Sequence, residues 1–332
     1  MELPCDAEYT ASVLLITIYP MVDLSDVRSL LITGTNGFVG RSLVEQIGKL
    51  DESNLPGKLY LVTRRGLDFN LPSKLLRITR VLQQDLTVEW NLELQVSHII
   101  NLAADGSKFP YSIEANNTFT LIVKNLISWI STFRETPHLF HSSSGACYGY
   151  KPIDTISGLT DPKSSFVRNR IQAEDDLKRA SEAFDFKLSI GRLFTFSGVN
   201  LLNKDRYAIS HFIKSGVTSR NILVTGDPNT VRSYLHQNDM ANWILAAILH
   251  PDSNTDLQIG SNKAVTIREL AEFVAENTSS NLSYSSNPTP GDIYLPNNQE
   301  TRAKLQVTEG ENWKPAVLEM INIVRMGNDA KL

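Results

Sequence analysis

The sequence predicts an α/β protein with a doubly wound parallel sheet and a smaller carboxyl-terminal lobe. Three observations support this fold class. An apolar strand near residue 30 runs directly into a glycine-rich turn and an amphipathic helix. Short apolar segments then alternate with helical segments as far as residue 194, which is the order that builds parallel sheets. With 332 residues, 42% of them apolar and 20% charged, the chain can also bury a large core.

The first strand, residues 30–32, is followed by three evenly spaced glycines. Gly34 permits a tight turn, and Gly37 lets the backbone approach a pyrophosphate. Gly40 lets the helix predicted at residues 41–49 pack closely on the strand, and the N–H groups at its start would face the anion. A purely structural turn is the alternative, but the order of strand, turn and helix favours a dinucleotide site.

The segments that follow continue this alternation. Strands are predicted at residues 58–63, 78–83, 97–104, 138–141 and 187–194. Helices are predicted at residues 114–133, where Leu121, Leu126, Ile127 and Ile130 share or adjoin one face, and around residues 166–174. The serine triplet at 142–144, taken alone, is more typical of a polar loop.

The remaining residues predict a second set of elements. These are a helix beginning at 207–214, a strand at 222–227, a helix at 240–249 and a strand at 257–261. Asp239 is expected to cap the helix after it, and Thr266 with Glu269 forms a capping box. Beyond Ser279 the abundance of Ser, Asn and Pro predicts a mobile loop before a last helix near 317–324.

Charge and cysteine content limit the classes of function. The formal net charge of -4 gives no electrostatic footprint for nucleic acid or an anionic membrane. We expect small-molecule partners, or a second copy of the chain as a homodimer partner. Cys5 and Cys147 are far apart and lack C-x-x-C spacing, and the six histidines are scattered. We therefore expect no disulfide framework and no metal site, in keeping with a reducing cytoplasm.

Residues 1–28 precede the glycine turn as an amino-terminal extension. Their apolar run, residues 13–19, is far too short to span a bilayer. Acidic residues precede it, but no Lys or Arg does, so a signal peptide is not expected. We expect an extra strand or helix that lies on the domain or at a subunit contact.

The spacing Thr33-Gly34-x-x-Gly37-x-x-Gly40 resembles the extended branch of the short-chain dehydrogenase/reductase superfamily. The resemblance extends to Asn101-Leu102-Ala103-Ala104, to the Ser-Ser-x-x-x-Tyr-Gly pattern at 143–149, and to residues 231–241. It implies membership of the NAD-dependent epimerase/dehydratase type, which acts on nucleotide sugars. A Rossmann-type NAD(P)-binding domain would then cover 29–194, with a return segment near 236–260. Residues 195–332 would form mainly the substrate-binding lobe.

The resemblance also implies a set of site residues. Those implied for the cofactor are Gly34, Asn36, Gly37, Phe38, Val39, Gly40, Arg64, Asp85, Leu86, Leu102, Ala103, Ala104 and Arg170. Those implied for the substrate are Ser144, as the catalytic serine, and Arg232, as a diphosphate contact. Arg64 favours NADP over NAD because an arginine can pair with the 2'-phosphate. A merely solvated arginine is an even alternative.

The chain departs from the family at the catalytic pair. The family places a tyrosine and, four residues later, a lysine on one helix face, where the tyrosine is the general acid/base. Phe166 and Arg170 occupy those positions here, and none of the ten tyrosines has a lysine four residues later. Phenylalanine cannot transfer a proton. Tyr148, Asp105 and Lys108 are the nearest substitutes in sequence.

Three accounts of this departure stay open: a binder without activity, an enzyme with another acid/base group, or a different reaction on the same scaffold. Gly145 and Ala146 stand where a 4,6-dehydratase would carry acidic residues. The sequence therefore favours an NAD(P)-binding nucleotide-sugar epimerase or reductase with non-standard acid/base chemistry. The alternative is an inactive member that binds cofactor or nucleotide sugar as a regulatory or partner subunit.

Overall fold

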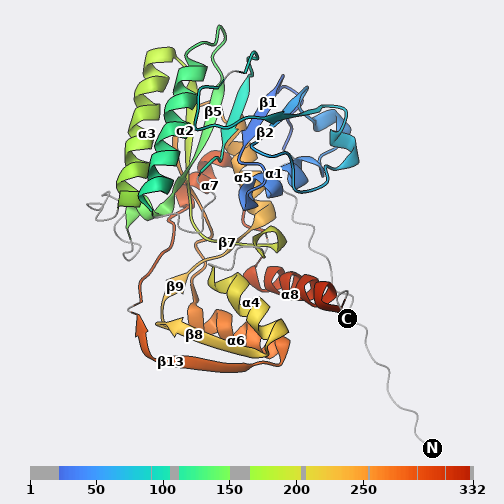
Figure 1. Ribbon diagram of the computed structural model, residues 1–332, viewed down its shortest axis with the longest axis vertical. Coiled ribbons are helices and arrows are strands. Elements are labelled where there is room, and N and C mark those ends of the chain that lie inside the picture. The colour runs from blue at the N-terminus through green and yellow to red at the C-terminus, as the bar shows by residue number, and fades with distance from the viewer. Residues whose placement is uncertain are drawn as a thin grey trace, which may run out of the picture.

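Seven parallel strands form the central sheet. They are β1 (Leu30–Thr33), β2 (Leu59–Thr63), β3 (Thr79–Gln83), β4 (His98–Asn101), β5 (His138–Ser144), β6 (Lys187–Leu193) and β11 (Thr255–Ile259). Their order is β11-β6-β5-β4-β1-β2-β3 (Figure 1). Every neighbouring pair is parallel. The order reverses between β1 and β4, which confirms the doubly wound fold and opens a crevice at the strands' carboxyl ends.

The computed structural model describes residues 22–90, 92–104, 112–149, 165–202, 207–252, 255–289, 291–310 and 312–329. The predicted extra element before residue 22, and the candidate residues Asp105 and Lys108, lie outside these ranges. Within them, no helix is both long enough and apolar enough to cross a membrane.

Two strands differ from the predictions. The strand expected over 97–104 is shorter, since β4 begins at His98 and ends at Asn101. In contrast, β5 continues through the serine triplet, which taken alone is more typical of a polar loop, and Ser144 ends the strand. Ser142, Ser143 and Ser144 pair in register with the end of β6. The backbone pairing holds these polar residues in the sheet.

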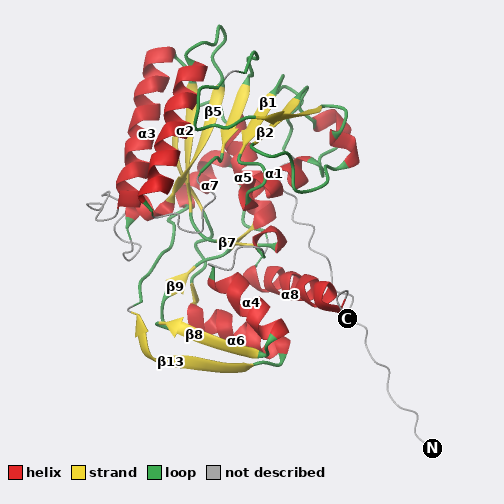
Figure 2. Cartoon of the chain, in the orientation of Figure 1, coloured by secondary structure: helices red, strands yellow, loops and turns green. Residues whose placement is uncertain are grey.

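Helices cover both faces of the sheet (Figure 2). On one face lie α1 (Phe38–Ile47) and α5 (Gln237–Leu249), and on the other lie α2 (Ile113–Ile130) and α3 (Ser165–Phe184). Each pair packs on its own apolar layer. The first helix was predicted at 41–49 but begins at Phe38, directly after Gly37. The glycine turn between β1 and α1 is therefore shorter than expected.

The apolar face of α2 was partly misassigned. Leu126 and Ile130 are buried as predicted and Ile127 is half-buried, but Leu121 is 46% exposed. The buried stripe instead includes Phe119, Ile122 and Val123. These positions follow the spacing of three and four residues that faces one side of a helix, whereas Leu121 falls on the opposite side.

The smaller lobe contains three helices, α4 (Ala208–Thr218), α6 (Ile267–Thr278) and α8 (Trp313–Asp329). They share one core beside β8 (Asn221–Gly226) and β13 (Asn281–Thr289), which pair in parallel. The mobile loop predicted beyond Ser279 is wrong, since β13 occupies its first part. Its Ser- and Asn-rich residues are held by backbone pairing, which composition does not reveal. The capping box of Thr266 and Glu269 is confirmed.

The chain passes between the lobes several times. The short strands β7 (Phe196–Ser197) and β10 (Leu235–His236) pair with each other, as do β9 (Val231–Arg232) and β12 (Val265–Thr266). The helix α7 (Gln299–Leu305) returns to pack on α5 and β11. Four short 3-10 helices complete the described elements: η1 (Glu52–Asn54), η2 (Ser73–Leu75), η3 (Gly145–Tyr148) and η4 (Val199–Leu201).

The predicted capping role of Asp239 is wrong. The helix α5 begins at Gln237, and its cap is His236, whose Nδ1 accepts a hydrogen bond from the Asn238 N–H at 3.2 Å. Asp239 lies inside the first turn, fully buried, and accepts from the Gly310 N–H at 3.2 Å. Its carboxylate therefore ties the segment before α8 to the start of α5.

Candidate active site

A cavity of about 1650 Å³ lies between the two lobes. Its upper wall consists of the carboxyl ends of β1, β2, β4, β5 and β6, where open α/β sheets bind ligands. Its lower wall comes from α4, the end of β8, β9 and residues 292–294. All the residues predicted for the cofactor line this cavity, as do Ser144, Phe166 and Arg232. The structure thus brings together side chains separated by up to two hundred positions.

The glycine turn is packed so closely that two of its glycines admit no side chain. Gly34 has φ +67°, and a Cβ there would lie 2.8 Å from the Leu102 carbonyl. A Cβ on Gly40 would lie 2.5 Å from the Gly34 carbonyl oxygen. Gly37 precedes the first residue of α1 and has no side chain to cap it. The first residues of the helix line the cavity, where an anion would satisfy their N–H groups.

A polar link crosses the sheet directly beneath the glycine turn. The Thr33 hydroxyl donates to Asn101 Oδ1 at 2.7 Å and accepts from the Leu102 and Ala103 N–H groups at 3.1 Å. The Asn101 amide in turn contacts His141 Nδ1 at 3.0 Å. Burial, aided by the charge of Arg170, lowers the pKa of His141 to about 3. A neutral His141 thus accepts this bond, and the link fixes three neighbouring strands.

Polar side chains gather at the end of the cavity beyond β2. Arg64 and Arg65 are exposed and line it. The Asn36 amide donates to the Gly66 carbonyl at 2.8 Å, which ties the glycine turn to the loop after β2. Hydrogen bonds from the Thr87 backbone and hydroxyl lower the pKa of Asp85. This end of the cavity therefore holds a carboxylate and two arginines.

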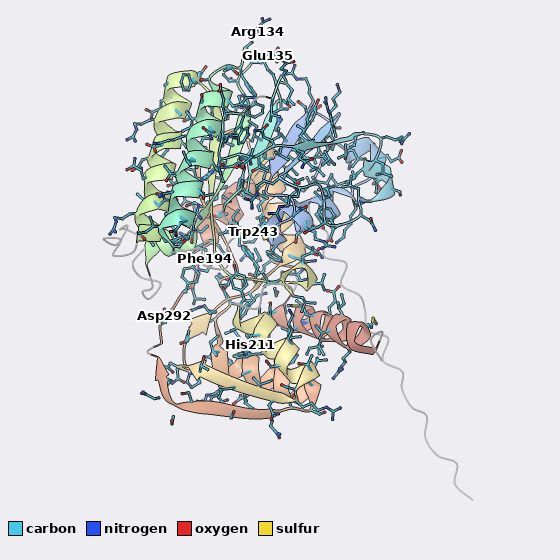
Figure 3. All side chains as sticks on the ribbon, viewed as in Figure 1. Arg134, Glu135, Phe194, His211, Trp243 and Asp292 are labelled. Atoms are coloured by element: carbon cyan, nitrogen blue, oxygen red, sulfur yellow. The ribbon has the colours of Figure 1, made fainter. Side chains whose placement is uncertain are left out.

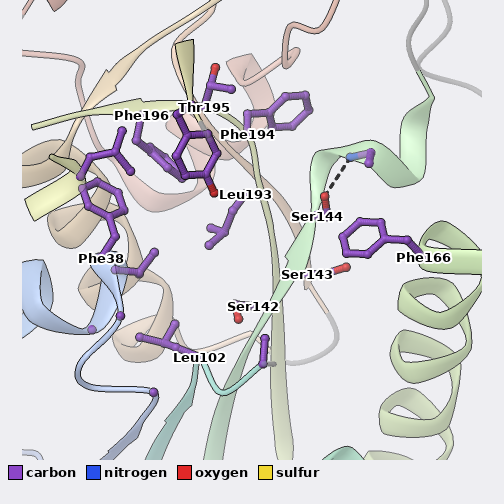
Figure 4. A pocket seen from close by; sticks show the side chains of 18 of the residues that line it. Phe38, Leu102, Ser142, Ser143, Ser144, Phe166, Leu193, Phe194, Thr195 and Phe196 are labelled. Atoms are coloured by element: carbon purple, nitrogen blue, oxygen red, sulfur yellow. Dashed lines mark hydrogen bonds between the residues drawn. The ribbon is translucent and has the colours of Figure 1, made fainter. Parts of the chain in front are cut away.

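The centre of the cavity contains the departures from the family pattern. Ser144 stands at the end of β5, and its hydroxyl accepts from the Ala146 N–H at 3.2 Å (Figure 4). Phe166 projects from α3 toward the end of β5. The guanidinium carbon of Arg170, one turn later, lies 3.3 Å from the ring centroid of Phe119 and 4.9 Å from that of Phe166. Arg170 is a cation stacked on two aromatic rings.

Arg170 keeps its charge in this position. Burial lowers its pKa to about 10, which still leaves the guanidinium protonated at neutral pH. Unlike a lysine, it presents a planar fork of donors that can pair with two oxygens at once. This placement is consistent with the prediction that Arg170 contacts the cofactor.

Tyr148 is not among the residues that line the cavity. Its ring is stacked against Phe194 with centroids 6.3 Å apart, and the Arg192 guanidinium lies 4.6 Å from it. Burial raises the pKa of its hydroxyl. Tyr148 is therefore part of the packing behind Ser144.

A buried ion pair that was not predicted from the sequence lies behind the end of β5. Glu174 on α3 accepts from Arg192 Nε at 3.1 Å and from Arg192 Nη2 at 2.5 Å. It also accepts from the Ser143 hydroxyl. Both charged side chains are at most 6% exposed. The pair joins α3, β5 and β6, so it fixes Ser144 relative to Phe166.

The lower wall positions Arg232. One of its nitrogens donates to the Val231 carbonyl at 2.8 Å and to the Asp292 carboxylate. The guanidinium carbon lies 5.8 Å from the ring centroid of Tyr294. Asp292 and Tyr294 were missed because they fall in the segment predicted as a loop. In Figure 3, Asp292 and His211 lie in the lower lobe, and Phe194 lies near its junction with the upper one.

Among the described residues, no group of three or more His, Cys, Asp or Glu could hold a metal.

Comparison with known proteins agrees with this arrangement. Residues 30–260 match the model of the NAD dependent epimerase/dehydratase family. A Methanocaldococcus jannaschii protein provisionally named UDP-glucose 4-epimerase is 23% identical over 299 residues, which is 87% of this chain and 93% of that protein.

Solved structures share the fold. The Bordetella bronchiseptica enzyme WbmF in complex with NAD+ has a TM-score of 0.73 at 17% identity, over 94% of this chain and 98% of that one. The Thermotoga maritima UDP-glucose 4-epimerase with UDP-glucose has a TM-score of 0.74 at 18% identity, over 90% and 99%.

Proposed function

The chain belongs to the NAD dependent epimerase/dehydratase family, and from that premise we propose that it binds NAD(P) and a nucleotide sugar and acts on the sugar as an epimerase or reductase. The continuity of the cavity carries this proposal. Its lining residues extend from the glycine turn past Ser144 to Arg232. At about 1650 Å³ it exceeds the roughly 300–1,000 Å³ of a typical single-ligand site. It is large enough for a cofactor and a substrate side by side.

The residues at the upper wall fit a dinucleotide. The crowded backbone around Gly34 and Gly40 sets the turn, and the uncapped start of α1 suits a pyrophosphate. Arg170 would hold ribose hydroxyls with its fork of donors. When bound, the nicotinamide supplies the two-electron oxidation and reduction that epimerases and reductases require.

The lower wall suits the nucleoside diphosphate part of a sugar nucleotide. Arg232 offers a planar cation, and the Asp292 carboxylate fixes its orientation. The sugar would then lie between Arg232 and the glycine turn, beside Ser144, whose hydroxyl would hydrogen-bond the reacting oxygen. The similar Thermotoga maritima structure contains UDP-glucose, which supports this class of substrate.

We further propose that Arg64 makes NADP the preferred cofactor. Calorimetric titration should give a Kd for NADPH about tenfold below that for NADH, because a charge-assisted contact to the 2'-phosphate contributes ~1.5 kcal/mol or more. Arg64→Ala should remove this difference and leave NADH binding unchanged. Arg80→Ala, on the exposed β3 strand, is the matched control. Equal Kd values in the unmodified protein would contradict the role of Arg64.

Substitutions of Arg232 test the proposed substrate site. Arg232→Ala should weaken the binding of UDP-glucose by ~1 to 3 kcal/mol, the scale of a charge-assisted hydrogen bond in a half-buried site. Arg232→Lys keeps the charge and should weaken binding less. Arg268→Ala removes an exposed charge from α6 and should leave the affinity for UDP-glucose unchanged. An affinity that is indifferent to Arg232→Ala would remove the diphosphate contact from the proposal.

A turnover assay separates the two functional candidates. The protein is incubated with NAD(P)+ and UDP-glucose, and the sugar product is analysed by chromatography. Interconversion of sugar epimers, or a change in nicotinamide absorbance that depends on the sugar, would establish an enzyme. Tight binding of both ligands without any product would instead favour a binding or regulatory protein.

A further inference from the structure

We propose that Tyr294 provides the phenol for proton transfer that Phe166 cannot provide. This inference rests on the proposed function and names a catalytic residue for it. Tyr294 lies outside the family's catalytic helix and comes from the segment that returns from β13 to the sheet. It lines the same cavity as Ser144, Phe166 and Arg170.

The hydroxyl of Tyr294 lies next to the serine turn. A Cβ built on Gly145 would be 2.7 Å from the Tyr294 hydroxyl oxygen and 2.7 Å from the Phe194 ring. Gly145 immediately follows Ser144 and begins η3. The absence of a side chain at position 145 is thus what allows the phenol to lie against the turn that follows Ser144. A residue with a side chain there would displace the Tyr294 hydroxyl.

The Tyr294 ring is held firmly in this place. Its backbone N–H donates to the Val231 carbonyl at 3.1 Å, and Ile293 forms a parallel bridge with Val231. The ring centroid lies 4.9 Å from that of Phe194, and only 8% of the residue is exposed. A catalytic group needs such a fixed geometry, because small misplacements cost large factors in rate.

Arg170 also lies at the centre of the cavity, but its guanidinium keeps its proton at neutral pH. The other phenols that line the cavity, Tyr207 and Tyr234, come from the start of α4 and from the core of the smaller lobe. Arg64 and Asp85 are at the end beyond β2. His211 and Asp292 lie in the lower lobe, whereas Phe194, which contacts both Tyr294 and the Gly145 position, lies near the junction (Figure 3). Tyr294 is therefore placed beside the serine that would bind the reacting oxygen.

The proton transfer balances with the cofactor already proposed. In the oxidative direction, the sugar hydroxyl gives its proton to the Tyr294 phenolate oxygen. The carbon gives its hydrogen and both bonding electrons to NAD(P)+, and a carbon–oxygen double bond forms. Ser144 hydrogen-bonds the same oxygen throughout. The reverse step returns the proton from Tyr294 to that oxygen.

The test compares Tyr294→Phe with Tyr284→Phe, which removes an exposed phenol from β13. Tyr294→Phe should lower kcat for UDP-glucose by ~100- to 10,000-fold, the usual contribution of general acid/base catalysis. Calorimetric Kd values for NADPH and UDP-glucose should stay close to those of the unmodified protein. Tyr284→Phe should change neither. Phe166→Tyr with Arg170→Lys, added to Tyr294→Phe, should recover activity at saturating cofactor, because it returns a phenol to the family position.

A second readout does not depend on turnover. With NADP+ bound, the ultraviolet absorbance of phenolate should change over the same pH range as kcat, and Tyr294→Phe should remove that change. Full activity in Tyr294→Phe, or the same absorbance titration in both phenol variants, would overturn the proposal. Binding of both ligands without turnover in the unmodified protein would also overturn it, while leaving the binding part of the proposed function intact. Failure to bind either ligand would contradict the proposed function itself.

Discussion

At the scale of single residues, the two departures from the family form one physical unit. A phenylalanine beside an arginine gives a flat apolar face on which the guanidinium stacks, and Phe119 supplies the second face at 3.3 Å. A lysine ammonium would interact less well with these two rings, because it is compact and strongly hydrated. The Phe166 ring therefore provides a stacking surface that suits the Arg170 guanidinium.

This pairing predicts the effect of Arg170→Lys. The change keeps the charge but loses the stacking and the planar fork, so the Kd for NADPH should rise roughly fivefold, equivalent to about 1 kcal/mol. Fluorescence titration of NADPH measures this change. Arg168→Lys, an exposed change on the same helix, is the control. If both variants bind NADPH as the unmodified protein does, the stacked arginine has no part in cofactor binding.

At the scale of elements, β1, the glycine turn and α1 form one closely packed unit. The turn is closed by backbone contacts on two sides, from Leu102 against Gly34 and from Gly34 against Gly40. No side-chain rearrangement can relieve a clash with backbone atoms. The position of the helix start therefore depends on glycine at positions 34 and 40.

Gly40→Ala should accordingly disrupt both stability and binding. Its Cβ would lie 2.5 Å from the Gly34 carbonyl and 2.6 Å from the Thr35 Cα, so the unfolding free energy should fall by ~1 to 3 kcal/mol or more, as for overpacking. NADPH binding should be lost as the turn shifts. Urea unfolding and calorimetry measure the two effects. Gly327→Ala on α8, where a Cβ meets nothing within 4 Å, is the control. Unchanged stability in Gly40→Ala would contradict the close packing of the turn.

At the scale of the whole molecule, the sheet buries histidines that must stay neutral. Burial lowers the pKa of both His138 and His141 to about 3. His138 contacts the Ser189 hydroxyl at 3.0 Å, and His141 contacts Asn101. In the unfolded chain both would titrate near pH 6.5. Below that pH the unfolded state binds more protons than the folded state, so acid favours unfolding.

Stability should therefore fall between about pH 6.5 and about pH 3, by up to ~1.4 kcal/mol per pH unit for each buried histidine. Urea unfolding across this range measures the slope. His141→Asn should be less stable at neutral pH but should show a shallower decline. His211→Asn, at the cavity surface, should keep the full slope. A stability that does not change from neutral to mildly acidic pH would show that these histidines are not held neutral by the fold.

The sequence by itself determined the doubly wound fold and the glycine turn after its first strand, because both depend on local patterns. Leu30 to Gly40 specify strand, turn and helix through apolar spacing and through glycines that nothing else can replace. The resemblance to the family predicted Ser144, Phe166, Arg170 and Arg232 as site residues, and all four line the cavity. Prediction from local patterns failed at β13 and at the face of α2, where backbone pairing and packing on distant residues outweigh composition.

Only the tertiary structure decided which of these side chains share a cavity. Tyr148 is four residues from Ser144 in the chain but packs behind it, whereas Tyr294 is distant in sequence and reaches the same turn. Likewise, the Glu174–Arg192 pair joins a helix to a strand that no local pattern connects. Such contacts arise where the strands' ends converge and the second lobe closes over them. Their geometry is set by long-range packing, which has no signature within a window of neighbouring residues.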